Sequence, residues 1–391
     1  MLKEESSLKT AILFVFLVVI VIAGSIFFNR IWAGKPKEVS EPNGLVVESN
    51  MTVLEFGQAN NLPNPQLRQI FNLQQRTDLQ KKLSEFGTPD EIRFMVTGKK
   101  AKATEYETKN WKKIAVKFIL WFAFLNVVYF YFKRRKVNSK VRKWVLFASV
   151  IIFGVIMGSD PGPMGTIKDA IVLLGKTHKI FPPRLIAMTA FLLIVFIANK
   201  YICAWGCQAG TLQDLVFRLN QNKDGKSIIG KQIKLPFVMT NTIRVLFLLI
   251  LTLIAFLWSY DIVEPIDPFK IFKPAHLGIS GIVFVGVLLL VSLFIYRPWC
   301  HLFCPFGLAG WIVEKFSRVK ISVNYDTCIA CNKCAKACPS TVMNAILKRD
   351  KRTIPDCFAC YSCRDICPTD SISFSTRKRT TPPSGHFDKD K

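Results

Sequence analysis

Residues 328–339, CIACNKCAKACP, and residues 357–368, CFACYSCRDICP, are two copies of one cysteine pattern near the end of a 391-residue chain. Each copy spaces its cysteines as C-x2-C-x2-C-x3-C and places a proline directly after the fourth. Two-residue gaps let one tight loop present three thiolates to the same centre, so the fourth ligand must come from elsewhere. The pattern therefore predicts two iron–sulfur centres that exchange their fourth ligands.

This spacing is typical of bacterial ferredoxins with two [4Fe–4S] clusters, and it predicts an α+β ferredoxin domain over residues 319–375. Zinc is the alternative metal for these cysteines, but zinc sites usually show two separated cysteine pairs. Disulfides are disfavoured because a cytoplasmic module is kept reduced. The expected ligands are Cys328, Cys331, Cys334 and Cys367 for the first cluster, and Cys357, Cys360, Cys363 and Cys338 for the second.

Upstream of this module the chain is both apolar and basic. Hydrophobic residues make up 50% of the sequence, the mean hydropathy is +0.28 and the formal net charge is +26. The basic residues lie in short runs beside long apolar segments, not in a stripe interleaved with aromatic residues. This arrangement indicates membrane topology and argues against nucleic-acid binding.

Six apolar segments are candidates for transmembrane helices, which need roughly 20 apolar residues. The third and fourth are short and would have to include flanking residues. The first could instead be a signal peptide cleaved at Ala23-Gly24-Ser25, but its apolar run through Phe28 favours an uncleaved anchor over residues 1–32. The segments are residues 11–29, 114–132, 144–158, 184–199, 244–263 and 277–296.

Basic residues set the expected orientation. Seven of them lie within residues 133–143, which places that loop in the cytoplasm. Counting spans outward, both termini and residues 200–236 are cytoplasmic, while residues 159–183 and 264–276 face outside. We therefore expect a multi-pass α-helical protein of the bacterial inner membrane, with about six spans, a C-terminal ferredoxin domain and a disordered tail over residues 376–391.

Residues 33–113 form the one sizeable extracytoplasmic insertion in this scheme. Thr52-x2-Glu55 has the pattern of a capping box, and Thr88-Pro89-Asp90-Glu91 combines a cap with proline at the first helical position. Apolar residues around these signals fit a few short helices. A docking or spacer domain is the simplest interpretation of this insertion.

Four further cysteines form two C-x3-C pairs, in YICAWGCQAG (201–210) and in RPWCHLFCPFG (297–307). Cys203 and Cys207 precede Cys300 and Cys304 by 97 residues, and glycines 210 and 307 are separated by the same offset. The segments leading to each pair therefore resemble an internal repeat, whose interface is the usual place for a site. On a helix, this spacing would put both sulfurs of a pair on one face, one turn apart.

Three interpretations of these four cysteines remain open. They could bind a third iron–sulfur cluster or another metal, act as redox-active dithiols, or be structural cysteines packed at a helix end. Two pairs at equivalent places weaken the structural interpretation. All three readings place the pairs in a redox core over residues 114–318, at the cytoplasmic edge of the membrane.

Two C-x3-C motifs followed by a two-cluster ferredoxin resemble the NapH/NosR-type membrane polyferredoxins over roughly residues 114–372. The family pattern is C-x3-C-P, twice; Pro305 matches it and Gln208 replaces the first proline. The family includes the membrane quinol dehydrogenase component of periplasmic nitrate reductase, the maturation protein of nitrous-oxide reductase and a cytochrome-oxidase accessory protein. The resemblance implies electron transfer between the quinone pool and partner redox proteins of a respiratory complex, in a subunit of a quinone-linked oxidoreductase that often supports a periplasmic enzyme.

The sequence offers no visible carrier across the apolar layer, since none of its four histidines lies mid-span. Electrons from a quinone site near the C-x3-C pairs would not have to cross the apolar layer, whereas a site at the outer edge would be remote from the clusters. For the two aspartates at the outer edge, Asp160 and Asp267, turn formation is the simpler role. The outer candidates for quinone or proton exchange are Asp160, His178, Asp267 and His276.

Two other functions compete with quinone-linked electron transfer. One is an assembly or maturation factor that reduces a metal or thiol in a partner respiratory enzyme. The other is a scaffold or regulator whose clusters act as sensors. Transport is disfavoured because the ionisable residues in the spans, Lys117, Arg244 and Asp261, lie near span ends. The direction of electron flow is open, because cluster potentials range from about −700 to +450 mV with their surroundings.

Overall fold

The computed structural model describes residues 2–32, 45–48, 50–134, 137–222, 227–348, 356–376 and 379–387. Outside this part lie residues 33–44 of the expected extracytoplasmic insertion and residues 377–378 and 388–391 of the expected tail. Arg135 and Lys136, two of the seven basic residues that set the expected orientation, also lie outside it, as do Lys223 and Lys226 of the expected cytoplasmic segment 200–236.

Within the described residues, three helices are long and apolar enough to cross a membrane, consistent with membrane association. They are residues Ser6–Trp32 of α1 (Leu2–Trp32), α5 (Trp111–Arg134) and α11 (Phe237–Leu257). Two other expected spans are shorter apolar helices, α8 (Pro182–Ala198) and α12 (Ile279–Val291). The remaining one is α6 (Ser139–Ser149), which continues into the π-helical segment η3 (Val150–Ile156).

Helix α1 packs against η3 through small residues. A Cβ on Gly24 would lie 2.7 Å from Cγ1 of Val155, and Ser25 is fully buried. The alternative cleavage site at residues 23–25 therefore lies inside a continuous helix, at its contact with the bundle.

The expected outer loop over residues 159–183 contains a further helix, α7 (Pro163–Thr177), which packs against α8 and α11. A Cβ on Gly175 would lie 2.4 Å from the carbonyl oxygen of Ala255 in α11, so glycine permits the close approach. Hydropathy misses α7 because its buried face includes Lys168, whose Nζ lies 2.8 Å from Oδ2 of Asp261.

The second expected outer loop, residues 264–276, folds onto the bundle as three short 3₁₀ helices. They are η4 (Glu264–Ile266), η5 (Pro268–Phe272) and η6 (Pro274–His276). The buried ring of Phe272 occupies the space beside Gly154 of η3, where a Cβ would lie 2.3 Å from Cε1. Asn29 of α1 donates a hydrogen bond to the carbonyl oxygen of Phe272, at 2.9 Å.

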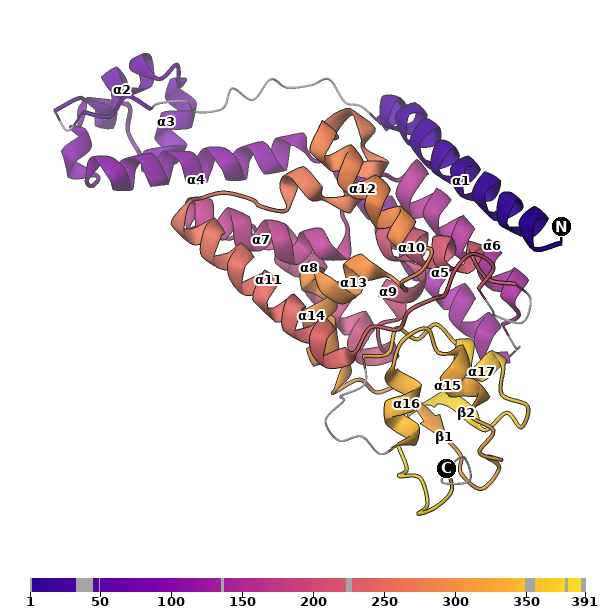
Figure 1. Cartoon of the computed structure of the whole chain (residues 1–391). Helices are drawn as coiled ribbons and strands as arrows, with labels where there is room; N and C mark the ends of the chain where they lie inside the picture. The colour runs from indigo at the N-terminus through magenta and orange to yellow at the C-terminus, as the bar shows by residue number, and fades with distance from the viewer. Residues whose placement is uncertain are drawn as a thin grey trace.

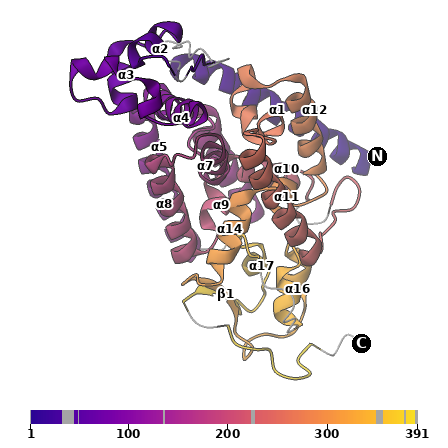
Figure 2. The same cartoon turned by 90° about the vertical axis from the view of Figure 1, so that its left-hand side faces the viewer.

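A small helical unit precedes α5 and has its own core. It consists of α2 (Val53–Ala59), α3 (Asn64–Phe71), η1 (Arg76–Gln80), η2 (Leu83–Glu85) and α4 (Pro89–Thr108). Both predicted caps are confirmed: Thr52 and Thr88 each form a complete capping box, with Glu55 and Glu91. Two views place this unit and the C-terminal module at opposite ends of the molecule (Figure 1, Figure 2).

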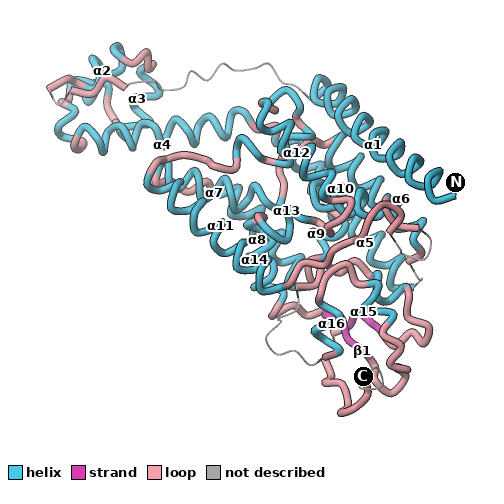
Figure 3. Tube along the Cα trace, viewed as in Figure 1, coloured by secondary structure: helices cyan, strands magenta, loops and turns pink. Residues whose placement is uncertain are grey.

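The C-terminal module contains the two-stranded antiparallel sheet that Figure 3 shows in magenta. Strand β1 (Lys320–Val323) pairs with β2 (Ile372–Ser375), and α15 (Lys333–Ala337), α16 (Val342–Leu347) and α17 (Ser362–Asp365) lie between them in the chain. The described part of the expected tail packs on β1, since Arg379 Nε donates to the carbonyl oxygen of Ile321 at 3.0 Å.

Candidate redox centres

Two equivalent loops present the eight cysteines of the C-terminal module. In each loop the second and fourth residues after the first cysteine have positive φ: Ala330 (57°) and Asn332 (53°), then Ala359 (51°) and Tyr361 (60°). Residues with positive φ adopt the left-handed backbone conformation, which lets the chain turn sharply within a few residues. This local geometry is how a short loop can turn three thiols toward one centre.

Thiols of each expected ligand set influence one another electrostatically, although within the described residues no group of three or more metal-ligating side chains is close enough to hold a metal ion. Burial raises the pKa of Cys334 to about 11, and the other three thiols of the first set raise it too. Burial likewise raises the pKa of Cys363, and the other three thiols of the second set are among its neighbours. Cys367 and Cys338 therefore each lie beside the loop of the opposite run. Buried thiols resist ionisation, and bound iron would supply the compensating positive charge.

The C-x3-C pairs bridge breaks between helices. Cys203 lies in α9 (Tyr201–Trp205) and Cys207 caps the start of α10 (Gln208–Leu219). Cys300 lies in α13 (Pro298–Leu302) and Cys304 caps the start of α14 (Pro305–Glu314). The prediction that both sulfurs of a pair lie on one helical face was therefore wrong, because each pair spans two helices.

The two motifs have the same backbone geometry although only one contains proline. Cys207 has φ −75° and ψ 114°, and Cys304 has φ −70° and ψ 115°. Gln208 and Pro305 both occupy the first helical position, where proline is well tolerated but not required. The substitution thus leaves the motif intact and provides a side chain for another contact.

Glycine at the shared offset lets each second helix return close to the first. A Cβ on Gly210 would lie 3.0 Å from the carbonyl oxygen of Cys203, and one on Gly307 would lie 2.8 Å from that of Cys300. The Gly307 N–H also donates to Sγ of Cys304, at 3.3 Å. Hydrogen bonds of this kind stabilise a thiolate and tune an iron–sulfur cluster.

The four thiols form one buried group, which we call the thiol core (Cys203, Cys207, Cys300 and Cys304). Each residue is 6–8% exposed. Burial raises the pKa of Cys304, and the other three thiols of the core raise it further. Burial raises the pKa of Cys300 to about 12, against the opposing effect of Arg297, Arg244 and Lys200. The thiol core therefore combines four sulfurs with three nearby cations.

Two of these cations connect the repeats reciprocally. Lys200 and Arg297 each stand three residues before a motif, 97 residues apart. Lys200 Nζ donates to the carbonyl oxygen of Gly307, at 3.1 Å, in the second motif. Arg297 Nη2 donates to the carbonyl oxygen of Ala204, at 2.8 Å, in the first motif. Sequence reasoning missed this pair, although the same offset that aligns the cysteines aligns these cations.

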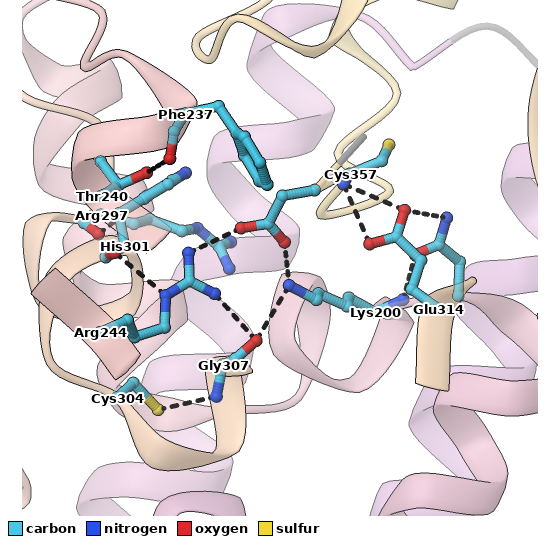
Figure 4. Close-up of polar contacts among 12 residues, drawn as sticks. Lys200, Phe237, Thr240, Arg244, Arg297, His301, Cys304, Gly307, Glu314 and Cys357 are labelled. Atoms are coloured by element: carbon cyan, nitrogen blue, oxygen red, sulfur yellow. Dashed lines mark hydrogen bonds and ion pairs between the residues drawn. The ribbon is translucent and has the colours of Figure 1, made fainter. Parts of the chain in front are cut away.

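Buried carboxylates neutralise the cations. Arg297 Nη2 lies 2.7 Å from Oδ2 of Asp214, and Lys200 is paired with Asp356. Arg244 Nη2 also reaches Asp356, at 2.7 Å, and its Nη1 donates to the carbonyl oxygen of Gly307 at 2.9 Å (Figure 4). Arg244 is fully buried, so its place near a span end reflects this pairing.

The same network fastens the second cluster loop to the thiol core. Asp356 directly precedes Cys357, whose N–H donates to both carboxylate oxygens of Glu314 in α14, at 3.1 and 3.2 Å (Figure 4). Burial would raise the pKa of Asp356, but Lys200 and Arg244 hold it well below its usual range. Burial raises the pKa of Glu314 to about 8. The loop of the second expected cluster is thus held by the end of α14, the helix that begins directly after Cys304.

Three of the four outer candidates line one cavity of about 380 Å³, which also contains Lys168: Asp160, Asp267 and His276. His178 lies instead at the end of α7, with its ring 6.4 Å from that of Phe256. Asp160 pairs with Lys273, and burial raises the pKa of Asp267 to about 6. Asp267 also accepts a hydrogen bond from the Phe269 N–H, at 2.9 Å, which is the expected turn role.

Comparison with known families identifies iron–sulfur domains in both regions. A model described as "4Fe-4S dicluster domain" matches residues 320–368, and one described as "4Fe-4S binding domain" matches residues 180–231 and 277–324. The second model therefore matches twice, once around each C-x3-C pair. No solved structure matches the chain.

Relatives carry names from electron transport. The chain is 30% identical over 185 residues to "Putative electron transport protein YccM" of Escherichia coli, covering 44% of this chain and 50% of that protein. It is 24% identical over 178 residues to the "Methylamine utilization ferredoxin-type protein MauN" of Methylobacillus flagellatus, covering 41% and 58%. The chain thus spans about half the length of these relatives. Together with the domain matches, they support iron–sulfur electron transport.

Proposed function

We propose that this protein is a multi-pass inner-membrane electron carrier that passes electrons between the quinone pool and partner redox proteins, as the NapH/NosR-type polyferredoxins do. The observation that carries the proposal is the buried ion network, in which Asp356 joins the second cluster loop to Lys200 and Arg244 beside the thiol core. A structural network alone would not need four buried thiols at its centre.

Two [4Fe–4S] clusters belong to the C-terminal module, in the ligand sets described above, and the thiol core holds a third. A bound cluster supplies a one-electron carrier. Four thiolates, three cations and a backbone N–H to Cys304 form a donor set suited to an anionic iron–sulfur group. The match of a 4Fe–4S binding domain around each motif supports the same assignment.

The order of the three centres follows from burial. The thiol core lies inside the bundle, and the second cluster loop contacts the first motif beside it, because Trp205 Nε1 donates to the carbonyl oxygen of Ala359 at 3.2 Å. The first set is at the far end and includes Cys331, which is exposed, so it is the place for exchange with a soluble redox partner. Lys200, Arg244 and Arg297 stabilise negative charge at the core, while Glu314 positions the Cys357 backbone.

Reduction by a quinol tests this function. In the full chain, purified anaerobically in detergent, menadiol is expected to bleach the cluster absorbance, with dithionite defining full reduction. Clusters that respond to dithionite and never to menadiol would contradict the quinone link. Reoxidation by a copper or disulfide partner alone would instead support the maturation-factor alternative.

A further inference from the structure

We propose that the cavities around Asp160 form a quinol site on the side of the molecule opposite to the ferredoxin module, and that Gln208 and Trp299 couple this site to the thiol core. The inference rests on the proposed function and specifies where the quinol binds. It also supplies the route across the apolar layer that the sequence does not reveal.

Helix α5 shows that the cavities and the ferredoxin module lie at opposite ends. Its first turn lines a cavity of about 670 Å³ through Lys113 and Ile114. At its last turn the carbonyl oxygen of Phe132 accepts a hydrogen bond from Arg364 of the module, at 2.7 Å. A helix of this length measures roughly 35 Å, close to the thickness of a bilayer core.

Three cavities meet at Asp160 and together provide a polar end and an apolar approach. The cavity of about 670 Å³ lies against α1 and α5, and the charged one of about 380 Å³ lies against α7. A third, of about 90 Å³, is lined by Phe118 of α5 together with Phe181 and Ala187. Cofactor and ligand sites are mostly apolar with a few polar groups that fix orientation. A quinol matches this lining because it has a flat apolar ring, hydroxyl groups at its two ends and an apolar tail.

The first motif contacts this site through Gln208, which directly follows Cys207. Its side chain is fully buried, and Nε2 donates to the carbonyl oxygen of Ser159 at 2.6 Å, one residue before Asp160. Its Oε1 has no hydrogen-bond partner within the described part of the chain. A Cβ on Gly162, which lines two of the cavities, would lie 3.4 Å from Gln208 Nε2.

The second motif contacts the site through Trp299, which directly precedes Cys300. Its indole Nε1 donates to Sδ of Met164, at 3.1 Å, and Met164 lines the charged cavity. Each motif therefore touches the cavity wall with the residue beside one of its cysteines. An outer site is not remote from the redox centres, contrary to the sequence-based expectation, because Gln208 and Trp299 join its wall to the thiol core. The core therefore lies between the outer cavities and the ferredoxin module, and not at the cytoplasmic edge.

The reaction at this site is the two-electron oxidation of a quinol. One quinol becomes one quinone as both O–H bonds break, releasing two electrons and two protons. An iron–sulfur centre held by Cys203, Cys207, Cys300 and Cys304 would accept the electrons one at a time, and the clusters held by the ferredoxin cysteines would serve as the oxidants. The protons pass to Asp267 in the charged cavity, whose pKa burial raises to about 6, and from there to water.

Three variants of the full chain test the site, with menadiol as the probe and cluster bleaching as the readout. Asp160→Asn removes the charge at the meeting point of the cavities. Gln208→Pro gives the first motif the proline that the second motif has at Pro305, and it removes the Ser159 contact. We expect each to slow menadiol-dependent bleaching about ten-fold, the loss expected for one hydrogen bond involving a buried or charged group. Asp90→Asn, on the exposed surface of α4, is the control and should bleach like the wild type.

Iron content and the dithionite-reduced spectrum show whether each variant is intact. If Asp160→Asn does not retain iron, Lys273→Gln takes its place, since it removes the partner of the same ion pair. Wild-type rates in Gln208→Pro and in the intact Asp160 or Lys273 variant would overturn the inference while leaving the proposed function standing. A wild-type protein that menadiol never bleaches would instead remove the proposed function itself.

Discussion

The single carboxylate of Asp356 connects three segments of the chain through ion pairs and its place in the sequence. It compensates Lys200 before the first motif and Arg244 in α11, and it is adjacent to Cys357 in the second cluster loop. Both cations are fully buried. Neither can be solvated if the carboxylate is lost, so the residue connects stability with the position of the loop.

We therefore expect Asp356→Asn to lower the free energy of unfolding by about 3–5 kcal/mol, the usual effect of leaving a buried charge without its partner. The measurement is denaturant unfolding of the detergent-solubilised protein, followed by circular dichroism. Asp326→Asn, on an exposed turn of the same module, is the matched control and should change stability little. Equal stability of the two variants would mean that the ion network does not hold the loop.

Residue-level chemistry was only partly predictable from the sequence. Cysteine spacing predicts the ligand sets because the geometry of a cluster is expressed directly in that spacing, and the matched dicluster domain over residues 320–368 agrees with it. The cations were harder to find, because Arg244 resembles an ordinary residue at a span end. Lys200 and Arg297 could have been found by applying the 97-residue offset to every position instead of to cysteine and glycine alone.

The C-x3-C element is a helix, a break and a second helix. A spacing of four residues fits a continuous helix equally well, so sequence periodicity could not distinguish the two. The decisive signal was the glycine three residues after each second cysteine, since the returning helix approaches the carbonyl oxygen of the first cysteine. Gly210 and Gly307 are therefore conformational requirements of the motif.

Two glycines of α14 allow this requirement to be tested. Gly307→Ala places a Cβ 2.8 Å from the carbonyl oxygen of Cys300 and should distort the thiol core. Gly310→Ala meets nothing closer than 3.6 Å and should be tolerated. We expect Gly307→Ala to lose about four irons per chain, one [4Fe–4S] cluster, and Gly310→Ala to lose none. Iron analysis of the two purified proteins decides; retention of all iron by Gly307→Ala would contradict the close-packing argument.

The helix caps could be predicted from the sequence, whereas the buried helix α7, which carries charged side chains, could not. The capping boxes at Thr52 and Thr88 were predictable because they depend only on residues three apart. Helix α7 was missed because Lys168 interrupts its apolar pattern, and only the folded chain shows that Asp261 neutralises it. Hydropathy cannot recognise a charge that is compensated by residues distant in the sequence.

The whole molecule is arranged as a series of sites along one axis. The cavities around Asp160 adjoin the first motif through Gln208, and the second cluster loop contacts the same motif through Trp205. The ferredoxin module and the small helical unit lie at opposite ends of the molecule (Figure 1). Such an order suits electron transfer across a membrane, with partners on either side. This order requires the small helical unit and the ferredoxin module to lie on opposite sides of the membrane.

Reporter fusions test this orientation. A fluorescent protein fused after the last residue should fluoresce, because the C-terminus is expected in the cytoplasm. A phosphatase inserted at Gln74, in the loop between α3 and η1, should be active only if that unit is exported. Phosphatase activity at the C-terminus, or fluorescence from an insertion at Gln74, would reverse the proposed topology.

The central claim is that the thiol core binds a third iron–sulfur cluster and relays electrons to the ferredoxin module. The most direct measurement is iron and acid-labile sulfide per chain in anaerobically purified protein, with Cys203→Ser and Cys300→Ser prepared in parallel. We predict about twelve irons in the wild type and about eight in each variant, because each [4Fe–4S] cluster contributes four. About eight irons in all three proteins would contradict the claim and leave the thiol core as a dithiol or structural centre.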